Sequence, residues 1–215
     1  LQVTRFAWEQ LRASAYLVNE TGGIGHFLPN YGRMIRRGIR GYLEDMEAKG
    51  DDLHEAARIA CEGVSDFALR LSAEAARLGA QERDPQRAGE LNAMARICGR
   101  VPMEPARTFH EACQSLWLTH LAVCLEGLNS AVSFGRIDQY LWPYYREDIE
   151  NGRITREEAL DIALSFSAKT TEHLFLLSGR ASEYHGGYLV AQAATVGGMD
   201  RDGNDGVNDL TYLFL

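Results

Sequence analysis

The thirteen residues from Ser133 to Tyr145 constrain the fold of this chain more than any other stretch. They place a Gly-Arg pair, a carboxylate, a carboxamide and a dense group of aromatic side chains close together, which no simple amphipathic repeat explains. Residues three and four apart share one helical side, and those on that side here are Tyr140, Leu141, Tyr144 and Tyr145. The residues alone therefore predict an aromatic helix start buried in a large core.

Two residues of this stretch give more specific predictions. Asp138 follows Arg136 by two positions, so we expect it to cap the helix or to form an ion pair with the guanidinium group. Pro143 lacks a backbone donor and its ring clashes with the preceding turn, which predicts two short turns rather than one straight helix.

Most of the remaining chain carries helical patterns separated by capping signals. Asp84-Pro85 opens one such segment, and Thr155 with Glu158 forms a capping box before another. The patterns predict helices over 31–49, 53–80, 85–98, 105–127 and 155–173, and strands around 128–134 and 186–197. The apolar residues of 53–80 predicted to face inward are Ile59, Val64, Phe67 and Leu71.

Charge and apolar content exclude some classes of partner. The formal net charge is −8, with acidic and basic residues interspersed, whereas nucleic acids and anionic membranes require a basic face. The longest apolar stretches are far shorter than a membrane span. We therefore expect a cytoplasmic protein with no nucleic-acid or membrane partner.

The cysteines and histidines do not predict a metal site. Cys61, Cys98, Cys113 and Cys124 are widely spaced and form no Cys-x-x-Cys pair, so neither a zinc knuckle nor a disulfide framework is indicated. His110 and His120 are ten residues apart and do not share a helical face, which favours core histidines.

The ends of the sequence suggest a piece of a longer polypeptide. The chain starts at Leu1 rather than Met and stops inside the apolar run 210–215. Its 215 residues, of which 46% are apolar, suffice for one sizeable core. We expect residues 1–215 to be part of a single domain that is incomplete at both ends.

Three motifs occur in order along the chain. The first motif segment (residues 25–31) contains Gly25-His26 and Pro29-Asn30-Tyr31. The central motif (residues 133–145) contains Ser133, Gly135, Arg136, Asp138, Gln139 and Tyr140, followed by Pro143-Tyr144-Tyr145. The third motif segment (residues 185–211) contains His185-Gly186-Gly187-Tyr188, Gln192, Val196-Gly197-Gly198 and Asn208-x-Leu210-Thr211. Together they resemble the glycyl radical enzymes of the pyruvate formate-lyase-like branch.

The resemblance implies an α/β fold, with this chain a predominantly helical fragment of a ten-stranded α/β barrel of the pyruvate formate-lyase type. It also implies anaerobic radical chemistry with no bound cofactor or metal. In that family, a separate radical-SAM activating enzyme installs a radical on a backbone glycine. The radical passes to a cysteine inside the barrel, whose thiyl form abstracts hydrogen from a small-molecule substrate. A homodimer is expected for the full-length protein.

Two parts of the chain imitate the radical machinery but lie in the wrong place. Cys124-Leu125-Glu126 has the family's Cys-x-Glu spacing, yet it precedes the central motif, which the family's cysteine loop follows. Arg40-Gly41-Tyr42 is similar to the glycine loop but lies near the N-terminus. By resemblance, this chain therefore has no catalytic residue and is inactive alone.

What remains by resemblance is the substrate side of the barrel. His26 and His185 match positions that face the substrate, and His185 replaces the Phe or Tyr that is common there. Ser130 and Ala131 stand where dehydratase members often have a His-Ser pair, which argues against a diol dehydratase. The central-motif residues are expected to be structural.

Several functions stay open. The favoured one is radical cleavage of a C–C, C–N, C–S or C–O bond by a lyase or decarboxylase. The alternatives are a glycerol, diol or hydroxyproline-type dehydratase, a formate acetyltransferase, or a helical scaffold without catalysis.

Overall fold

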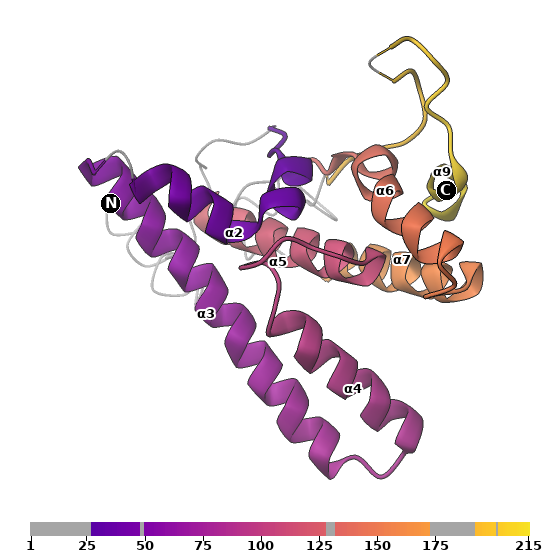
Figure 1. Ribbon diagram of the computed structural model, residues 1–215, viewed down its shortest axis with the longest axis horizontal. Coiled ribbons are helices and arrows are strands. Elements are labelled where there is room, and N and C mark those ends of the chain that lie inside the picture. The colour runs from indigo at the N-terminus through magenta and orange to yellow at the C-terminus, as the bar shows by residue number, and fades with distance from the viewer. Residues whose placement is uncertain (1–26, 48–49, 128–131, 173–191, 201) are drawn as a thin grey trace, which may run out of the picture.

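The computed structural model describes residues 27–47, 50–127, 132–172, 192–200 and 202–215. Its elements are α2 (Tyr31–Glu47), α3 (Asp52–Gln81), α4 (Pro85–Cys98), α5 (Phe109–Gly127), β1 (Gly135–Arg136), α6 (Ile137–Glu150), α7 (Arg156–Thr171), β2 (Ala194–Thr195) and α9 (Asp209–Leu213). A long α3–α4 hairpin projects from a body built by α5, α6, α7 and α9 (Figure 1). The mostly helical prediction is confirmed, and so are the capping box at Thr155 and the N-cap at Asp84.

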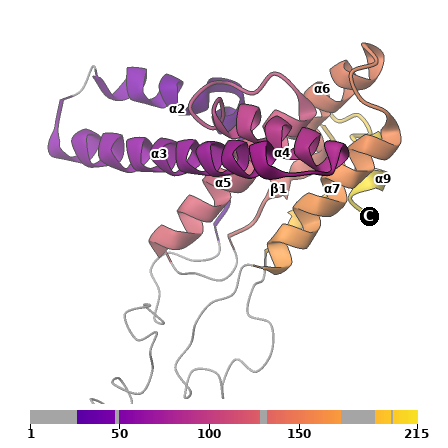
Figure 2. The same cartoon turned by 90° about the horizontal axis from the view of Figure 1, so that it is seen from below.

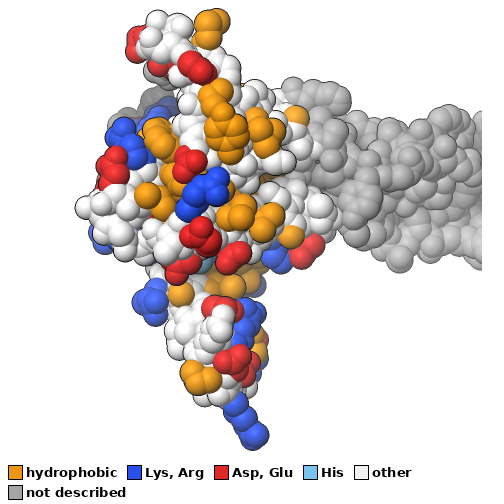
Figure 3. Space-filling model, turned by 90° about the vertical axis from the view of Figure 1, so that its right-hand side faces the viewer, with side chains coloured by type: hydrophobic (Ala, Val, Ile, Leu, Met, Phe, Trp, Pro, Cys, Tyr) orange, Lys and Arg blue, Asp and Glu red, His pale blue; other side chains and the backbone are white. Residues whose placement is uncertain are grey.

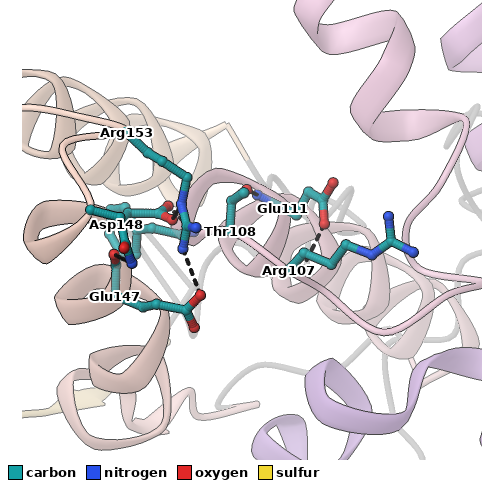
Figure 4. Close-up of polar contacts among 8 residues, drawn as sticks. Arg107, Thr108, Glu111, Glu147, Asp148 and Arg153 are labelled. Atoms are coloured by element: carbon teal, nitrogen blue, oxygen red, sulfur yellow. Dashed lines mark hydrogen bonds and ion pairs between the residues drawn. The ribbon is translucent and has the colours of Figure 1, made fainter.

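The helix predicted from residue 105 begins later, at Phe109, and the reason lies in α6. The buried carboxylate of Asp148 accepts a hydrogen bond from the backbone N–H of Phe109 at 2.7 Å, which satisfies a free donor of the first turn. Arg153 donates to the same carboxylate at 2.5 Å and to Glu147 at 2.8 Å (Figure 4). The first turn of α5 is therefore capped both by Asp148 of α6 and by Thr108, whose hydroxyl accepts from the N–H of Glu111 at 3.1 Å, while residues 101–103 form a turn.

α2 is kinked at Gly38, which the sequence pattern did not indicate. Gly38 has φ 65° and ψ 174°, outside the helical region. At the kink, the N–H groups of Ile39 and Arg40 donate to the carbonyl oxygens of Pro102 and Met103, each at 2.9 Å. The connection between α4 and α5 therefore replaces the helical partners that α2 loses there.

The prediction for the inward face of α3 was wrong at Ile59 and Leu71, whose side chains are 58% and 37% exposed. The buried residues of α3 are instead the small ones Ser65, Ala68, Ala75 and Gly79. α4 runs beside α3 in Figure 1, and the two helices overlap in the view of Figure 2. Small side chains let the two backbones approach closely, so that Ser72 Oγ donates to the carbonyl oxygen of Ala95 at 2.7 Å.

α6 continues through Pro143, so the prediction of two short turns was wrong. Leu141 and Tyr145, on either side of the proline, are buried, whereas Pro143 itself is exposed. Tyr145 also packs edge-on against Phe109 at a ring distance of 5.6 Å. Tertiary packing on both sides of the proline therefore holds the helix together despite the missing hydrogen bond.

The surface at the α6, α7 and α9 end mixes apolar and charged side chains (Figure 3). Large apolar residues of α7 and α9 stand exposed there, among them Leu164 and Tyr212. Exposed apolar surface of this kind commonly marks a contact with another part of a protein. Among the described helices, none is long and apolar enough to cross a membrane.

Candidate functional site

β1 and β2 bring the central motif and the third motif segment together in a parallel pair. Gly135 lies opposite Ala194, and the backbone N–H of Phe134 donates to the carbonyl oxygen of Ala193 at 2.8 Å. β2 lies within the strand predicted over 186–197, and β1 directly follows the one predicted over 128–134. Residues 128–131 and 186–191 of those predictions lie outside the described part of the chain.

The first motif segment pairs with the central motif just before β1, through an isolated parallel bridge beside the two-stranded sheet. Phe27 forms a parallel bridge with Val132, and the N–H of Ser133 donates to the carbonyl oxygen of Phe27 at 3.0 Å. Three segments that are far apart in the sequence are therefore hydrogen-bonded neighbours, in the order first, central, third.

The four candidate substrate-side residues lie outside the described residues: His26, Ser130, Ala131 and His185. The structure does place the residues that directly follow two of these candidates. Phe27 follows His26 and Val132 follows Ala131, and these two described residues form the bridge. The central motif, by contrast, is described throughout.

Asp138 connects α6 to the third motif segment. Its side chain is fully buried, and its Oδ2 accepts hydrogen bonds from the backbone N–H of Gly197 and the hydroxyl of Thr211, both at 2.6 Å. The side-chain amide of Asn208 donates to the backbone carbonyl of Asp138 at 3.4 Å. Among the described residues, Oδ1 of Asp138 has no hydrogen-bond partner. A single carboxylate oxygen thus fixes the end of β2 and the start of α9.

The predicted ion pair between Arg136 and Asp138 is not formed. The guanidinium group of Arg136 donates instead to the carbonyl oxygens of Gly197, at 2.5 Å, and Met199. Arg136 and Asp138 therefore bind the same segment through its carbonyl and N–H groups respectively, rather than each other. The prediction failed because a two-residue separation says nothing about backbone groups about sixty residues away in the sequence.

Gln139 also binds the third motif segment, and we call the side chains of Arg136, Asp138 and Gln139 together the clamp. Its side-chain amide donates to the carbonyl oxygen of Gly206 at 2.5 Å. A Cβ atom on Gly206 would lie 2.8 Å from the carbonyl oxygen of Gly198 and 2.9 Å from Arg136 Nη2, so only glycine permits this approach. Arg136, Asp138 and Gln139 of the central motif thus each hydrogen-bond to the third motif segment.

A second buried polar group lies behind the sheet, on α5. His120 is fully buried, and its Nδ1 is hydrogen-bonded to the hydroxyl of Tyr31 at 2.7 Å. Its Nε2 lies 3.5 Å from Cys124 Sγ. Burial, and secondarily the nearby Cys124, raises the pKa of the Tyr31 phenol, and burial raises the pKa of the Cys124 thiol to about 11. Both groups therefore keep their protons at neutral pH.

The described residues offer no obvious metal centre. No group of three potential ligands gathers among them, and the four cysteines are unbridged. The acidic loop after β2 is a polar turn in which Asp200 Oδ1 accepts from the N–H groups of Asp202 and Asn204 at 2.9 and 2.8 Å.

Sequence reasoning missed two residues that organise the site. Thr211 was part of the third motif segment, but its hydroxyl was not paired with Asp138, 73 residues away. Tyr31 was taken as a helix start rather than as the partner of His120. The sequence did mark both residues in one way, because each belongs to a motif and the order of the motifs along the chain matches a family pattern.

Comparison with known proteins identifies the class of protein to which this sheet and clamp belong. The family model described as pyruvate formate lyase-like matches residues 5–215. The chain is 38% identical to the isethionate sulfite-lyase of Oleidesulfovibrio alaskensis over 94% of its own length. It spans only 27% of that lyase.

Solved structures agree with this match. A glycyl radical enzyme from Archaeoglobus fulgidus is 40% identical, with a TM-score of 0.82, over 89% of this chain and 26% of that one. A structure concerned with 1,2-propanediol dehydration in Roseburia inulinivorans gives a TM-score of 0.86 at 30% identity, over 96% of this chain and 28% of that one. The chain belongs to the pyruvate formate lyase-like family of glycyl radical enzymes.

Proposed function

We propose that this chain forms the substrate-side wall of a longer glycyl radical enzyme of the lyase type. That enzyme cleaves a C–C, C–N, C–S or C–O bond in a small organic substrate. The similarity to isethionate sulfite-lyase favours a C–S bond. Because the chain spans about a quarter of its relatives, the radical glycine and the thiyl cysteine belong to the rest of that polypeptide.

The observation that carries this proposal is that three distant segments pair side by side, two in the β1–β2 sheet and the third through a parallel bridge next to it. The bridge between Phe27 and Val132 brings the ends of the segments bearing His26 and Ala131 together. β2 adds the end of the segment bearing His185. The described residues next to these candidates therefore come from paired segments, which supports a common wall.

The candidate residues then have distinct roles. His26 and His185 bind and orient the polar groups of the substrate, since imidazole donates or accepts hydrogen bonds around neutral pH. Ser130 and Ala131 line the wall, and the small Ala131 leaves room beside the substrate. A closed barrel keeps water away from the substrate during the reaction.

The radical supplies hydrogen abstraction, which leaves a substrate radical that expels its leaving group. The protein partner we propose is a radical-SAM activating enzyme in an oxygen-free cytoplasm, and the assembly is a homodimer. The apolar side chains exposed on α7 and α9 are consistent with further protein covering that end.

The test uses the complete enzyme, activated under anaerobic conditions by its activating enzyme. Electron paramagnetic resonance should detect the glycyl radical, and isethionate should release sulfite. Conversion of 1,2-propanediol to an aldehyde would instead favour a dehydratase, which the structural similarity keeps as second candidate. Absence of a radical under conditions that activate a known family member would support the non-catalytic scaffold.

We expect the His185→Phe enzyme to fold normally but to lose about tenfold in kcat/KM for its best substrate. One hydrogen bond to substrate corresponds to roughly this factor. Steady-state kinetics beside thermal unfolding measures both quantities. The matched control is His110→Phe on α5, at a half-buried histidine away from the sheet. Unchanged kinetics in His185→Phe would remove His185 from the substrate site.

A further inference from the structure

His120 contacts two of the three segments that meet in the sheet. Its Nδ1 is hydrogen-bonded to Tyr31, the last residue of the first motif segment and the first of α2. Its ring also lies on Phe134 of the central motif, with ring centroids 4.1 Å apart and planes inclined by 33°. Tyr31 and Phe134 are themselves 6.2 Å apart, which closes a triangle of buried rings.

This triangle lies close to the bridge that joins the two segments. Tyr31 is four residues after Phe27, and Phe134 follows Ser133, whose N–H donates to Phe27. The same two segments are therefore linked twice, once through backbone groups and once through the imidazole of His120. The second link is a side-chain hydrogen bond in a fully buried place, where leaving a group unpaired is costly.

We propose that His120 is a positioning residue, which holds the first motif segment in register with the central motif and so sets the place of the substrate wall. The effect of His120 on the substrate wall rests on the proposed function, whereas its effect on the pairing of the two segments does not. The hydroxyl of Tyr31 carries the contact.

The test compares Tyr31→Phe with Tyr42→Phe in the complete enzyme. Both changes remove a phenolic hydroxyl from α2, but Tyr42 lies under Arg33, with the guanidinium carbon 5.0 Å from the ring centroid, and not on His120. We expect hydrogen exchange at the Ser133 amide to quicken about tenfold in Tyr31→Phe only, as the loss of one buried hydrogen bond implies. KM should rise by a similar factor, while kcat and the radical content stay near the parent values.

A second pair of variants probes the imidazole itself. In His120→Asn, the amide atoms lie as far from Cβ as Nδ1 does, so the bond to Tyr31 can persist, whereas His120→Leu removes it. We expect His120→Asn to recover part of the exchange protection and of the KM that His120→Leu loses.

The outcomes separate this inference from the proposed function. If the activated parent protein forms no glycyl radical, the proposed function fails, but Ser133 exchange still decides the role of His120. Unchanged Ser133 exchange in Tyr31→Phe overturns the inference. So does faster exchange with unchanged KM in an active enzyme, because His120 would then serve stability alone.

Discussion

Replacing Asp138 with alanine should lower the free energy of unfolding by about 3 kcal/mol, since it leaves two buried donors without an acceptor. Those donors are the N–H of Gly197 and the hydroxyl of Thr211, and both now bind Oδ2 of Asp138 at 2.6 Å. Urea denaturation followed by circular dichroism measures the change. Because the clamp also joins α6 to α9, we expect exchange protection to fall first in the segment from Gly197 to Thr211.

Asp138→Asn tests whether the fold is stabilised by the two hydrogen bonds that Asp138 accepts or by its negative charge. One oxygen takes both hydrogen bonds, so the asparagine carbonyl can accept them, and the loss should be about half that of Asp138→Ala. Asp161→Ala, at an exposed carboxylate of α7, serves as the control and should change stability little. Equal losses in Asp138→Ala and Asp161→Ala would show that the clamp does not stabilise the fold.

Local chemistry predicted the helix ends well. Asp84 and Thr155 cap their helices because a short polar side chain reaches the N–H group two or three residues ahead. Such signals depend only on neighbouring residues, which the sequence shows directly. The prediction for the inward face of α3 failed because that face is decided by packing against another helix, which neighbouring residues do not show. An amphipathic pattern assumes that large apolar residues face the interior, whereas here Ala68 and Ala75 do so to let α4 approach.

The contacts that build the site could not be predicted from spacing. Asp138 and Gly197 are 59 residues apart, and Tyr31 and His120 are 89 apart. The motif order along the chain matched a family pattern, and the parallel pairing of the described residues brings the three segments together. It did not indicate that Arg136 and Asp138 bind backbone rather than each other, since any backbone carbonyl or N–H is invisible in a residue pattern.

The kink in α2 leads to the second large expected effect. Gly38→Ala should lower the free energy of unfolding by more than about 3 kcal/mol, because the left-handed backbone costs a side-chain residue 1–2 kcal/mol before any clash. The clash is severe, since a Cβ there would lie 2.5 Å from the carbonyl oxygen of Met103 and 2.8 Å from the nitrogen of Pro105. Both are backbone atoms, which cannot rotate away. The loss would be measured by urea denaturation.

Gly63→Ala on α3 is the matched control. No atom lies within 4 Å of a Cβ built there, and Gly63 is exposed within a regular helix. Alanine favours a helix interior over glycine by about 1 kcal/mol, so this variant should be more stable than the parent. The same chemical change should therefore act in opposite directions at the two sites. If Gly38→Ala is as stable as Gly63→Ala, the connection between α4 and α5 does not hold the kink, and α2 can straighten into the single helix that its sequence predicts.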